Sequence, residues 1–266
     1  MITSTSNKQI KNIIQLSKKP KVRKDQGLFL VEGIKMFEEA PSKEIEKVYI
    51  SKSFLEHPSH VLLLKEKGFD PADSKYLEVV EDKVFTTISD TITPQGILCV
   101  IKQEKYEFKD FIVGKPLLLV IENLQDPGNL GTILRTGEAA GVTGIIINRT
   151  SVDIYNPKTI RSTMGSVYRV PFLYVDSLIT SISKLKEHKI AVYAAHLAGK
   201  KDYYREDYTK GSAFLIGNEG NGLSEEIVQK ADELIKIPMC GQVESLNAAM
   251  AAGVLLYEGY RQRTEL

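Results

Sequence analysis

The stretch FLIGNEGNGLSEEI, from Phe214 to Ile227, decides the fold of the second half of this chain. An apolar run, Ala213 to Ile216, is typical of a short buried strand. Several glycines then alternate with polar residues around one carboxylate, Glu219. Ser224 is a typical helix N-cap, and two glutamates follow it in the first turn, where carboxylates suit the helix dipole. The stretch therefore predicts a strand, a glycine-rich turn and a capped helix.

Such a turn lets bare backbone approach a ligand, because glycine has no side chain. We interpret the turn as the floor of a cofactor site, with Glu219 held inside it. An ordinary strand-to-helix connection would show the same pattern, so the stretch alone leaves both interpretations open.

The composition of the whole chain is that of a globular protein. Its 266 residues suffice for two domains of ordinary size, with 42% hydrophobic and 26% charged residues. The formal net charge is only +1. Any nucleic-acid site must therefore be a local basic patch rather than a property of the whole surface.

Cysteine and histidine usage gives no metal or disulfide pattern. Cys99 and Cys240 lie far apart in the sequence, which favours a reducing cytosol. The four histidines form no metal constellation; His196 ends an apolar strand and could line a cleft, although a structural role is favoured. The N-terminus does not resemble a secretory signal, and no apolar run approaches membrane-spanning length. We predict a cytoplasmic protein with no metal and no membrane association.

The first 24 residues are basic, with no acid before Asp25. Isoleucines at helical spacing predict an amphipathic helix over residues 7–18. Its polar face and the KKPKVRK segment after it would form a basic stripe that suits a phosphate partner, although a charge run can also be an ordinary solvated face. The basic residues are Lys8, Lys11, Lys18, Lys19, Lys21, Arg23 and Lys24.

The chain divides into two α/β patterns. Short strand-like and helix-like units predict a small α/β domain over residues 1–102, which has no nucleophile–base pair and is interpreted as a substrate-holding module. Residues 103–115 are charged and predict a linker. PLLLVI, Pro116 to Ile121, is typical of a buried parallel strand and opens a second α/β domain over residues 116–266. A last helix is predicted over residues 245–260, capped by Ser245 and rich in small residues that permit close packing.

Three segments of the second half carry polar groups that could form one site. NLQDPGNLGTILRTGEAAG, Asn123 to Gly141, ends a strand and opens a helix near Asn129, whose free N–H groups suit an anion. Arg135 follows about one turn into that helix, where a guanidinium could reach a phosphate. The glycine-rich stretch with Glu219 is the second segment.

The third segment is IPMCGQVESLNAAMAAG, Ile237 to Gly253, where Ser245 and Asn247 flank Leu246 at the start of the last helix. A helix-capping role accounts for the serine at position 245. It leaves the side-chain amide of Asn247 available for another contact. None of these segments has the glycine order of a dinucleotide-binding fold or of a phosphate-binding loop, so neither NAD nor ATP is indicated.

Together the motifs NLGTILRT, IGNEGNGL and IPMCGQVESLNAA resemble those of the SpoU (TrmH-type) family of SPOUT RNA methyltransferases. The resemblance covers residues 116–258. The first half, from SNKQIKNIIQL to VEGIKMFEEA, is similar to the ribosomal-protein-like RNA-binding domain that often precedes this catalytic domain.

The resemblance implies a parallel-sheet domain with a deep trefoil knot, S-adenosylmethionine as cofactor, a homodimer, and methyl transfer to a ribose 2′-hydroxyl of structured RNA. By motif position, the cofactor loops would include Gly217, Ile237 and Leu246. The functional polar residues would be Asn129, Arg135, Glu219, Ser245 and Asn247. The predicted RNA contacts are Lys18, Lys19, Arg23 and Arg161.

Ribosomal RNA, most simply that of the large subunit, is the favoured substrate because a dedicated basic N-terminal domain suits a large folded RNA. A transfer RNA ribose methyltransferase, an enzyme that protects the ribosome from an antibiotic, and a non-enzymatic RNA-binding assembly factor remain alternatives. We hypothesise that Arg135 orients the ribose hydroxyl and its phosphate, because a guanidinium is a poor base.

Overall fold

The computed structural model describes residues 1–71 and 75–264, and it divides into two compact units. The first unit comprises residues 1–104 together with 155–168, and the second comprises residues 105–154 and the chain from residue 169 onward. Segment 155–168 therefore packs with the first unit, although the sequence placed it in the second domain. The rings of Phe29 and Tyr155 lie 4.5 Å apart, and the Tyr168 hydroxyl donates to the carbonyl oxygen of Met36.

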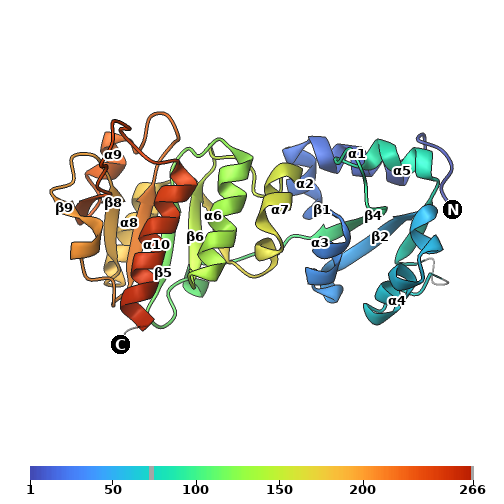
Figure 1. Cartoon of the computed structure of the whole chain (residues 1–266), viewed down its shortest axis with the longest axis horizontal. Helices are drawn as coiled ribbons and strands as arrows, with labels where there is room; N and C mark the ends of the chain where they lie inside the picture. The colour runs from blue at the N-terminus through green and yellow to red at the C-terminus, as the bar shows by residue number, and fades with distance from the viewer. Residues whose placement is uncertain (72–74, 265–266) are drawn as a thin grey trace. The chain divides into compact units, whose positions relative to one another are not determined.

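The elements of the first unit are α1 (Lys8–Lys18), α2 (Pro20–Gln26), β1 (Leu28–Glu32), α3 (Ile34–Glu39), β2 (Ile45–Ser51), α4 (Pro58–Glu66), β3 (Leu77–Val80), α5 (Asp82–Ile88), β4 (Ile97–Lys102) and α7 (Pro157–Thr163). The sheet order is β1-β4-β2-β3, and only the β2–β3 pairing among these is parallel. Figure 1 shows α1 and α5 together on one face of this sheet and α3 and α4 on the other.

Helix α1 forms as the sequence predicted. The Asn7 side chain accepts a hydrogen bond from the Gln9 amide and caps the helix. Ile10, Ile13 and Leu16 are buried against the sheet, while the lysines of α1 remain exposed. Pro20 then begins a second short helix, α2, because proline suits the first helical position.

Arg23 differs from its prediction as an RNA contact, because its side chain is only 2% exposed. Its guanidinium donates to the carbonyl oxygens of Leu16 and Ser17 at 2.6 and 2.9 Å, near the C-terminal end of α1. Those carbonyl oxygens lie in the last turn of a helix, where they have no intrahelical N–H donor. The guanidinium is therefore used to join α2 to α1 and is not presented to solvent.

The elements of the second unit are β5 (Leu117–Ile121), α6 (Pro127–Ala139), β6 (Gly144–Asn148), β7 (Phe172–Val175), α8 (Leu178–Glu187), β8 (Ala191–Ala195), β9 (Lys201–Asp202), β10 (Ser212–Ile216), α9 (Glu225–Val228), β11 (Glu233–Lys236) and α10 (Ala248–Thr264). The strand order is β7-β6-β5-β10-β8-β11-β9, and every pairing is parallel. The prediction of a buried parallel sheet is confirmed.

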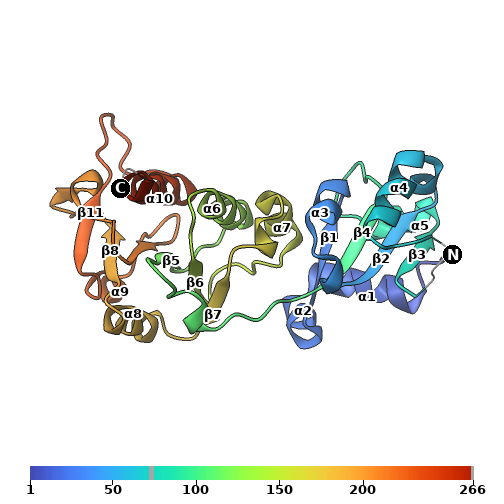
Figure 2. The same cartoon turned by 90° about the horizontal axis from the view of Figure 1, so that it is seen from below.

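Helices cover both faces of this sheet, which explains why β5 and β10 are buried at every position. Figure 2 shows α6 and α10 on one face and α8 and α9 on the other. Phe111, in the segment predicted as a linker, is fully buried in the core beside α8. Gly259 of α10 lets that helix approach β5, since a Cβ atom there would lie 3.3 Å from the Leu117 side chain.

The strand order reverses direction between β5 and β10. From β5 the chain moves outward through β6 and β7, then returns to build β8, β10 and β11 on the other side. In open parallel sheets, ligands bind beyond the carboxyl ends of the strands at such a reversal. None of the helices that the structure describes is both long and apolar enough to span a membrane.

Candidate functional site

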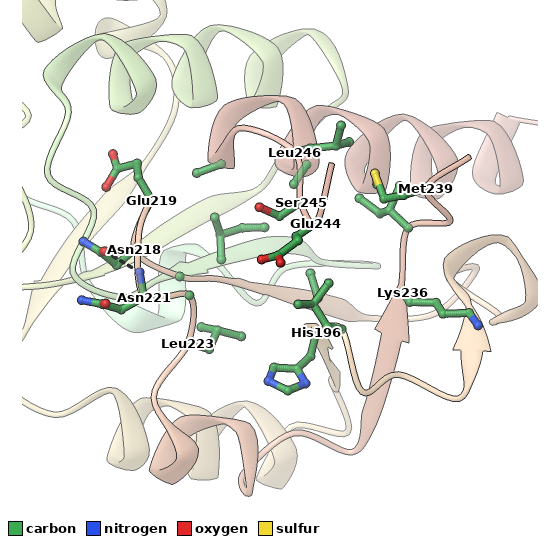
Figure 3. A pocket seen from close by; sticks show the side chains of 18 of the residues that line it. His196, Asn218, Glu219, Asn221, Leu223, Lys236, Met239, Glu244, Ser245 and Leu246 are labelled. Carbon is green, nitrogen blue, oxygen red and sulfur yellow. Dashed lines mark hydrogen bonds between the residues drawn. The ribbon is translucent and has the colours of Figure 1, made fainter. Parts of the chain in front are cut away.

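A cavity of about 600 Å³ lies beyond the carboxyl ends of β8, β10 and β11. Its walls come from the loop 217–223 after β10, the segment 237–246 after β11, and the first turns of α10. Figure 3 shows Leu246 on one side of the cavity and Leu223 and His196 on the opposite side. Two of the three segments singled out in the sequence therefore line one space directly.

The glycine-rich loop folds as a very tight turn. Asn218 and Gly222 exchange two backbone hydrogen bonds of 2.9 and 3.0 Å, so that Glu219, Gly220 and Asn221 form the tip. A Cβ atom on Gly217 would lie 2.2 Å from the carbonyl carbon of Gly222. Only glycine fits at position 217 without moving the backbone of the loop.

Glu219 joins this loop to the loop after β5. Its carboxylate accepts hydrogen bonds from the backbone amides of Gln125 and Asp126 at 3.1 and 2.9 Å. In Figure 3 the Glu219 side chain is turned away from the cavity, in keeping with these contacts. The carboxylate is therefore held in place by partners from the first of the three segments, Asn123 to Gly141.

The same contacts shift the pKa of Glu219. Partial burial raises that pKa, but the hydrogen bonds from the Asp126 amide, the Asn129 side chain and the Gln125 amide outweigh burial, so the pKa lies below its ordinary value. These donors stabilise the ionised form, because a carboxylate is a stronger hydrogen-bond acceptor than a neutral carboxyl group.

A chain of side chains extends from Glu219 to the last helix. The Asn129 amide donates to Glu219 at 3.0 Å, and its oxygen accepts from the Asn247 amide, also at 3.0 Å. Three of the five residues that the resemblance marked as functional are therefore in direct contact, although they lie 90 and 118 residues apart in sequence.

The start of the last helix differs from its prediction. Helix α10 begins at Ala248, and Asn247 precedes it as the cap, with its side-chain oxygen accepting from the amides of Ala249 and Met250 at 2.9 and 3.3 Å. Ser245 lies two residues earlier, in the cavity wall. Sequence reasoning chose Ser245 because serine is a good cap, but asparagine is equally good and its amide can also reach Asn129.

The predicted site residues occupy three kinds of position. The proposed cofactor residues Gly217, Ile237 and Leu246 line the cavity, and so does Ser245. Glu219 also belongs to the lining, although its carboxylate points away toward the loop after β5. Asn129 and Asn247 are outside the cavity lining and form the hydrogen-bonded chain described above. Arg135 is outside the cavity lining, exposed on α6, and its side chain makes no hydrogen bond or ion pair with any residue of 1–71 or 75–264.

Sequence reasoning missed several residues that hold the loops together. Asn123 adopts a left-handed backbone (φ 54°) and accepts at its carbonyl oxygen from the Asn218 side chain at 2.8 Å. Glu122 is buried and binds Ser224. The available signal was their place directly after a buried strand, where a polar residue has to find a partner.

His196 does line the cavity, with its Nδ1 accepting from the Ala198 amide.

The predicted RNA contacts lie in the first unit. Lys18 and Lys19 are exposed, as are Lys8, Lys11, Lys21 and Lys24 of the same stripe. Arg161 is engaged by Asp90, to whose carboxylate and carbonyl oxygen it donates. The basic stripe therefore consists of lysines alone.

The cavity suits a ligand of nucleoside size. Its volume falls within the range of about 300–1,000 Å³ that is usual for small-molecule sites. Apolar side chains such as Leu223 and Met239 alternate with backbone groups and with the carboxylates of Glu244 and Asp202. This mixture fits a group that joins an aromatic base to a charged amino-acid end. Across the part of the chain that the structure describes, no group of three or more histidine, cysteine, aspartate or glutamate residues could hold a metal ion.

Comparison with known proteins gives matches to both halves. The model of the SpoU rRNA Methylase family matches residues 116–257, and the model of the MRM3-like substrate binding domain matches residues 7–99. The 23S rRNA (guanosine(2553)-2′-O)-methyltransferase RlmP of Bacillus subtilis is 32% identical over 259 residues, which is 96% of this chain and 97% of the relative.

Two solved structures are similar to this chain along nearly its whole length. An AdoMet-bound rRNA methyltransferase from Sinorhizobium meliloti shares 30% identity with a TM-score of 0.81, covering 98% of this chain and 97% of that one. The SpoU methyltransferase AviRb from Streptomyces viridochromogenes, in complex with AdoMet, shares 25% identity with a TM-score of 0.86, covering 97% and 98%.

The depressed pKa of Glu219 predicts how stability depends on pH. Its contribution is fully present above the ordinary glutamate value of about 4.5 and is lost as the pH falls through the lower pKa of the folded state. The difference in free energy of unfolding between the unmodified protein and Glu219→Gln should therefore be constant near neutral pH and shrink only below about pH 4.5. Urea denaturation over this range measures it.

The control is Glu187→Gln on α8, an exposed glutamate that accepts no hydrogen bond from any residue the structure describes. Its difference curve should stay flat. A Glu219→Gln difference that already declines well above the ordinary value would contradict the assigned contacts.

Proposed function

Because the chain belongs to the SpoU rRNA methylase family, we propose that it transfers a methyl group from S-adenosylmethionine to a ribose 2′-hydroxyl of RNA. The cavity beside the Asn247–Asn129–Glu219 chain is the observation that carries this proposal, since it joins all three motifs at one place. The relative RlmP carries the same activity in its name, and two similar structures hold AdoMet.

The residues that would hold the cofactor are Gly217, Ile237 and Leu246, together with the apolar wall formed by Leu223 and Met239. When bound, S-adenosylmethionine supplies a methyl group on a positively charged sulfur. The tight fold of the glycine loop gives the ligand a rigid backbone surface. The loop therefore loses little conformational entropy when the ligand binds.

The reaction needs alignment of a neutral hydroxyl and removal of its proton more than it needs an oxyanion hole, because positive charge disperses during transfer. We assign that alignment to the residues around the cavity. Glu219, Asn129 and Asn247 fix the relative positions of three loops, and Ser245 lies in the wall they hold. Arg135, exposed on α6, orients the ribose hydroxyl and its adjoining phosphate.

Ribosomal RNA is the proposed substrate. The first unit carries exposed lysines on α1 and α2, and a stripe of this kind suits the phosphates of a large folded RNA. RlmP acts on 23S rRNA, and its similarity extends over both halves of this chain. Transfer RNA is the alternative substrate, and an RNA-binding assembly factor without activity is the alternative from another class.

We also propose the trefoil knot and the homodimer that the resemblance implies. In support of the knot, α10 follows β11 in sequence but returns across the sheet to pack on β5 and β10. In support of the dimer, α10 exposes three large side chains at helical spacing, Met250, Tyr257 and Tyr260, with 57%, 49% and 44% of their surfaces accessible. The molecular mass in solution tests the dimer.

The activity is tested by two measurements on the whole chain. Calorimetry should show binding of S-adenosylmethionine, and mapping of ribose methylation on ribosomal RNA should reveal one nucleotide that loses its methyl group when the gene is deleted. A methyl group lost from transfer RNA would favour the alternative substrate. Cofactor binding that is absent even at millimolar concentration would leave an assembly factor as the better explanation.

Arg135→Lys should reduce the single-turnover rate with saturating RNA and cofactor at least tenfold, about 1.4 kcal/mol of transition-state stabilisation, because lysine lacks the planar bidentate fork. The affinity for cofactor should not change, since Arg135 does not line the cavity. Arg149→Lys, at an exposed arginine that is paired with Asp176, is the matched control. A rate for Arg135→Lys close to that of the control would show that the assigned role is wrong.

Replacement of Lys18 and Lys19 by alanine should weaken binding of ribosomal RNA and flatten its dependence on salt, by about 0.7–0.9 in log–log slope for each phosphate that the protein no longer neutralises. Cofactor affinity should stay the same. Anisotropy titrations at several salt concentrations measure both the affinity and the slope.

Two controls accompany this variant. Lys43→Ala with Lys65→Ala removes the same charge from two exposed positions and should leave the slope unchanged. Lys65 is on α4, and Lys43 follows Ser42, whose hydroxyl donates to the Lys67 carbonyl oxygen just after α4. Arg23→Ala should instead lower stability, because it removes a buried group that holds two helices together. An equal effect of both lysine pairs would mean that the stripe is ordinary solvated surface.

A further inference from the structure

Glu122 is a buried acidic residue that the mechanism above does not use. It follows the last residue of β5 and is only 7% exposed. A buried carboxylate is costly unless all of its oxygens find donors. Here the donors come from one residue, Ser224, which lies 102 positions away in sequence.

The contacts of Glu122 reach both ends of the glycine-rich loop. Its backbone amide donates to the carbonyl oxygen of Ile216 at 2.9 Å, just before the loop begins. Its carboxylate accepts from the Ser224 amide at 2.8 Å and from the Ser224 hydroxyl at 2.7 Å, just after the loop ends. One residue therefore closes the loop 217–223 at its base.

The Ser224 hydroxyl also has a second partner. Its oxygen accepts from the Ile227 amide at 3.4 Å and caps α9. Because the hydroxyl proton points to Glu122, the oxygen lone pairs are left for the cap, and the two contacts support each other. Glu122 thus fixes where α9 begins as well as where the loop ends.

We propose that Glu122 is a positioning residue for the cofactor: by clamping the base of the loop 217–223, it holds the wall of the cavity in its binding form. Leu223, directly before Ser224, and Gly222 are both in that wall. Glu219 anchors the tip of the loop, and the backbone pair of Asn218 and Gly222 closes the turn. Glu122 adds the contact that ties Ser224, just after the loop, to the end of β5. This inference rests on the proposed function for the identity of the ligand, but the clamp itself does not.

The test compares Glu122→Gln with Glu258→Gln. Glu258 is also buried, and its carboxylate accepts from the Arg261 and Gln262 side chains, but it lies toward the C-terminal end of α10 and does not line the cavity. The glutamine amide in Glu122→Gln turns one acceptor into a donor, so it cannot accept both of the Ser224 hydrogen bonds.

Calorimetry with S-adenosylmethionine should show binding about tenfold weaker for Glu122→Gln and unchanged for Glu258→Gln. At saturating cofactor the rate of methyl transfer should stay within about threefold, since Glu122 touches no reacting group. Binding by Glu122→Gln within about twofold of the unmodified protein, or equal weakening in both variants, overturns the proposal.

Hydrogen exchange separates this inference from the proposed function. If the unmodified protein does not bind S-adenosylmethionine, the activity is wrong, yet the clamp can still be measured at the backbone amides of residues 217–224 in the free protein. These should exchange faster in Glu122→Gln and not in Glu258→Gln. If Glu122→Gln does not fold, Ser224→Ala, which removes only the hydroxyl, gives the same comparison, and unchanged exchange in it overturns the proposal.

Discussion

Parallel pairing of β5 with β10 is the constraint on which the site depends. These strands are separated by about ninety residues in sequence, yet their backbones pair from Leu117 with Ser212 to Ile121 with Ile216. Both strands end at the same level, so the segments that follow them start side by side. Short side chains such as Asn129, Glu219 and Ser224 can then reach a backbone group or a side chain of the neighbouring segment.

Several polar side chains at this edge of the sheet accept hydrogen bonds from backbone amides at the starts of helices. Glu219 satisfies two amides at the start of α6, Asn247 satisfies two at the start of α10, and Ser224 satisfies one at the start of α9. Side chains that meet the requirements of helix ends thereby also set the distances between loops. Stability and the shape of the cavity follow from the same hydrogen bonds, which is why the motifs combine glycine with asparagine and acids.

Periodicity in the sequence was enough to predict the buried strands, the parallel sheet, helix α1 and the Ser224 cap, because each depends on neighbours within a few positions. It could not predict contacts that depend on distant segments. Lysine and arginine in KKPKVRK look alike as charges, and only the packing of α2 on α1 shows that Arg23 is internal. Asparagine and serine are both good helix caps, so the sequence does not distinguish Asn247 from Ser245. Asn247 also donates a hydrogen bond to Asn129 on α6, a contact between distant segments. The place of Glu122 directly after a buried strand indicates that its carboxylate needs a partner, but not that the partner is Ser224, 102 residues away.

The segment 155–168 completes the first unit only after part of the second unit has been synthesised. Because α7 belongs to the first unit, the chain leaves that unit after residue 104, builds β5, α6 and β6, and comes back before it finishes the second sheet. During synthesis from the N-terminus, Phe29 and the surface around it must wait for Tyr155 before they are covered. A fragment that ends near residue 104 would therefore leave the ring of Phe29 without its cover from Tyr155.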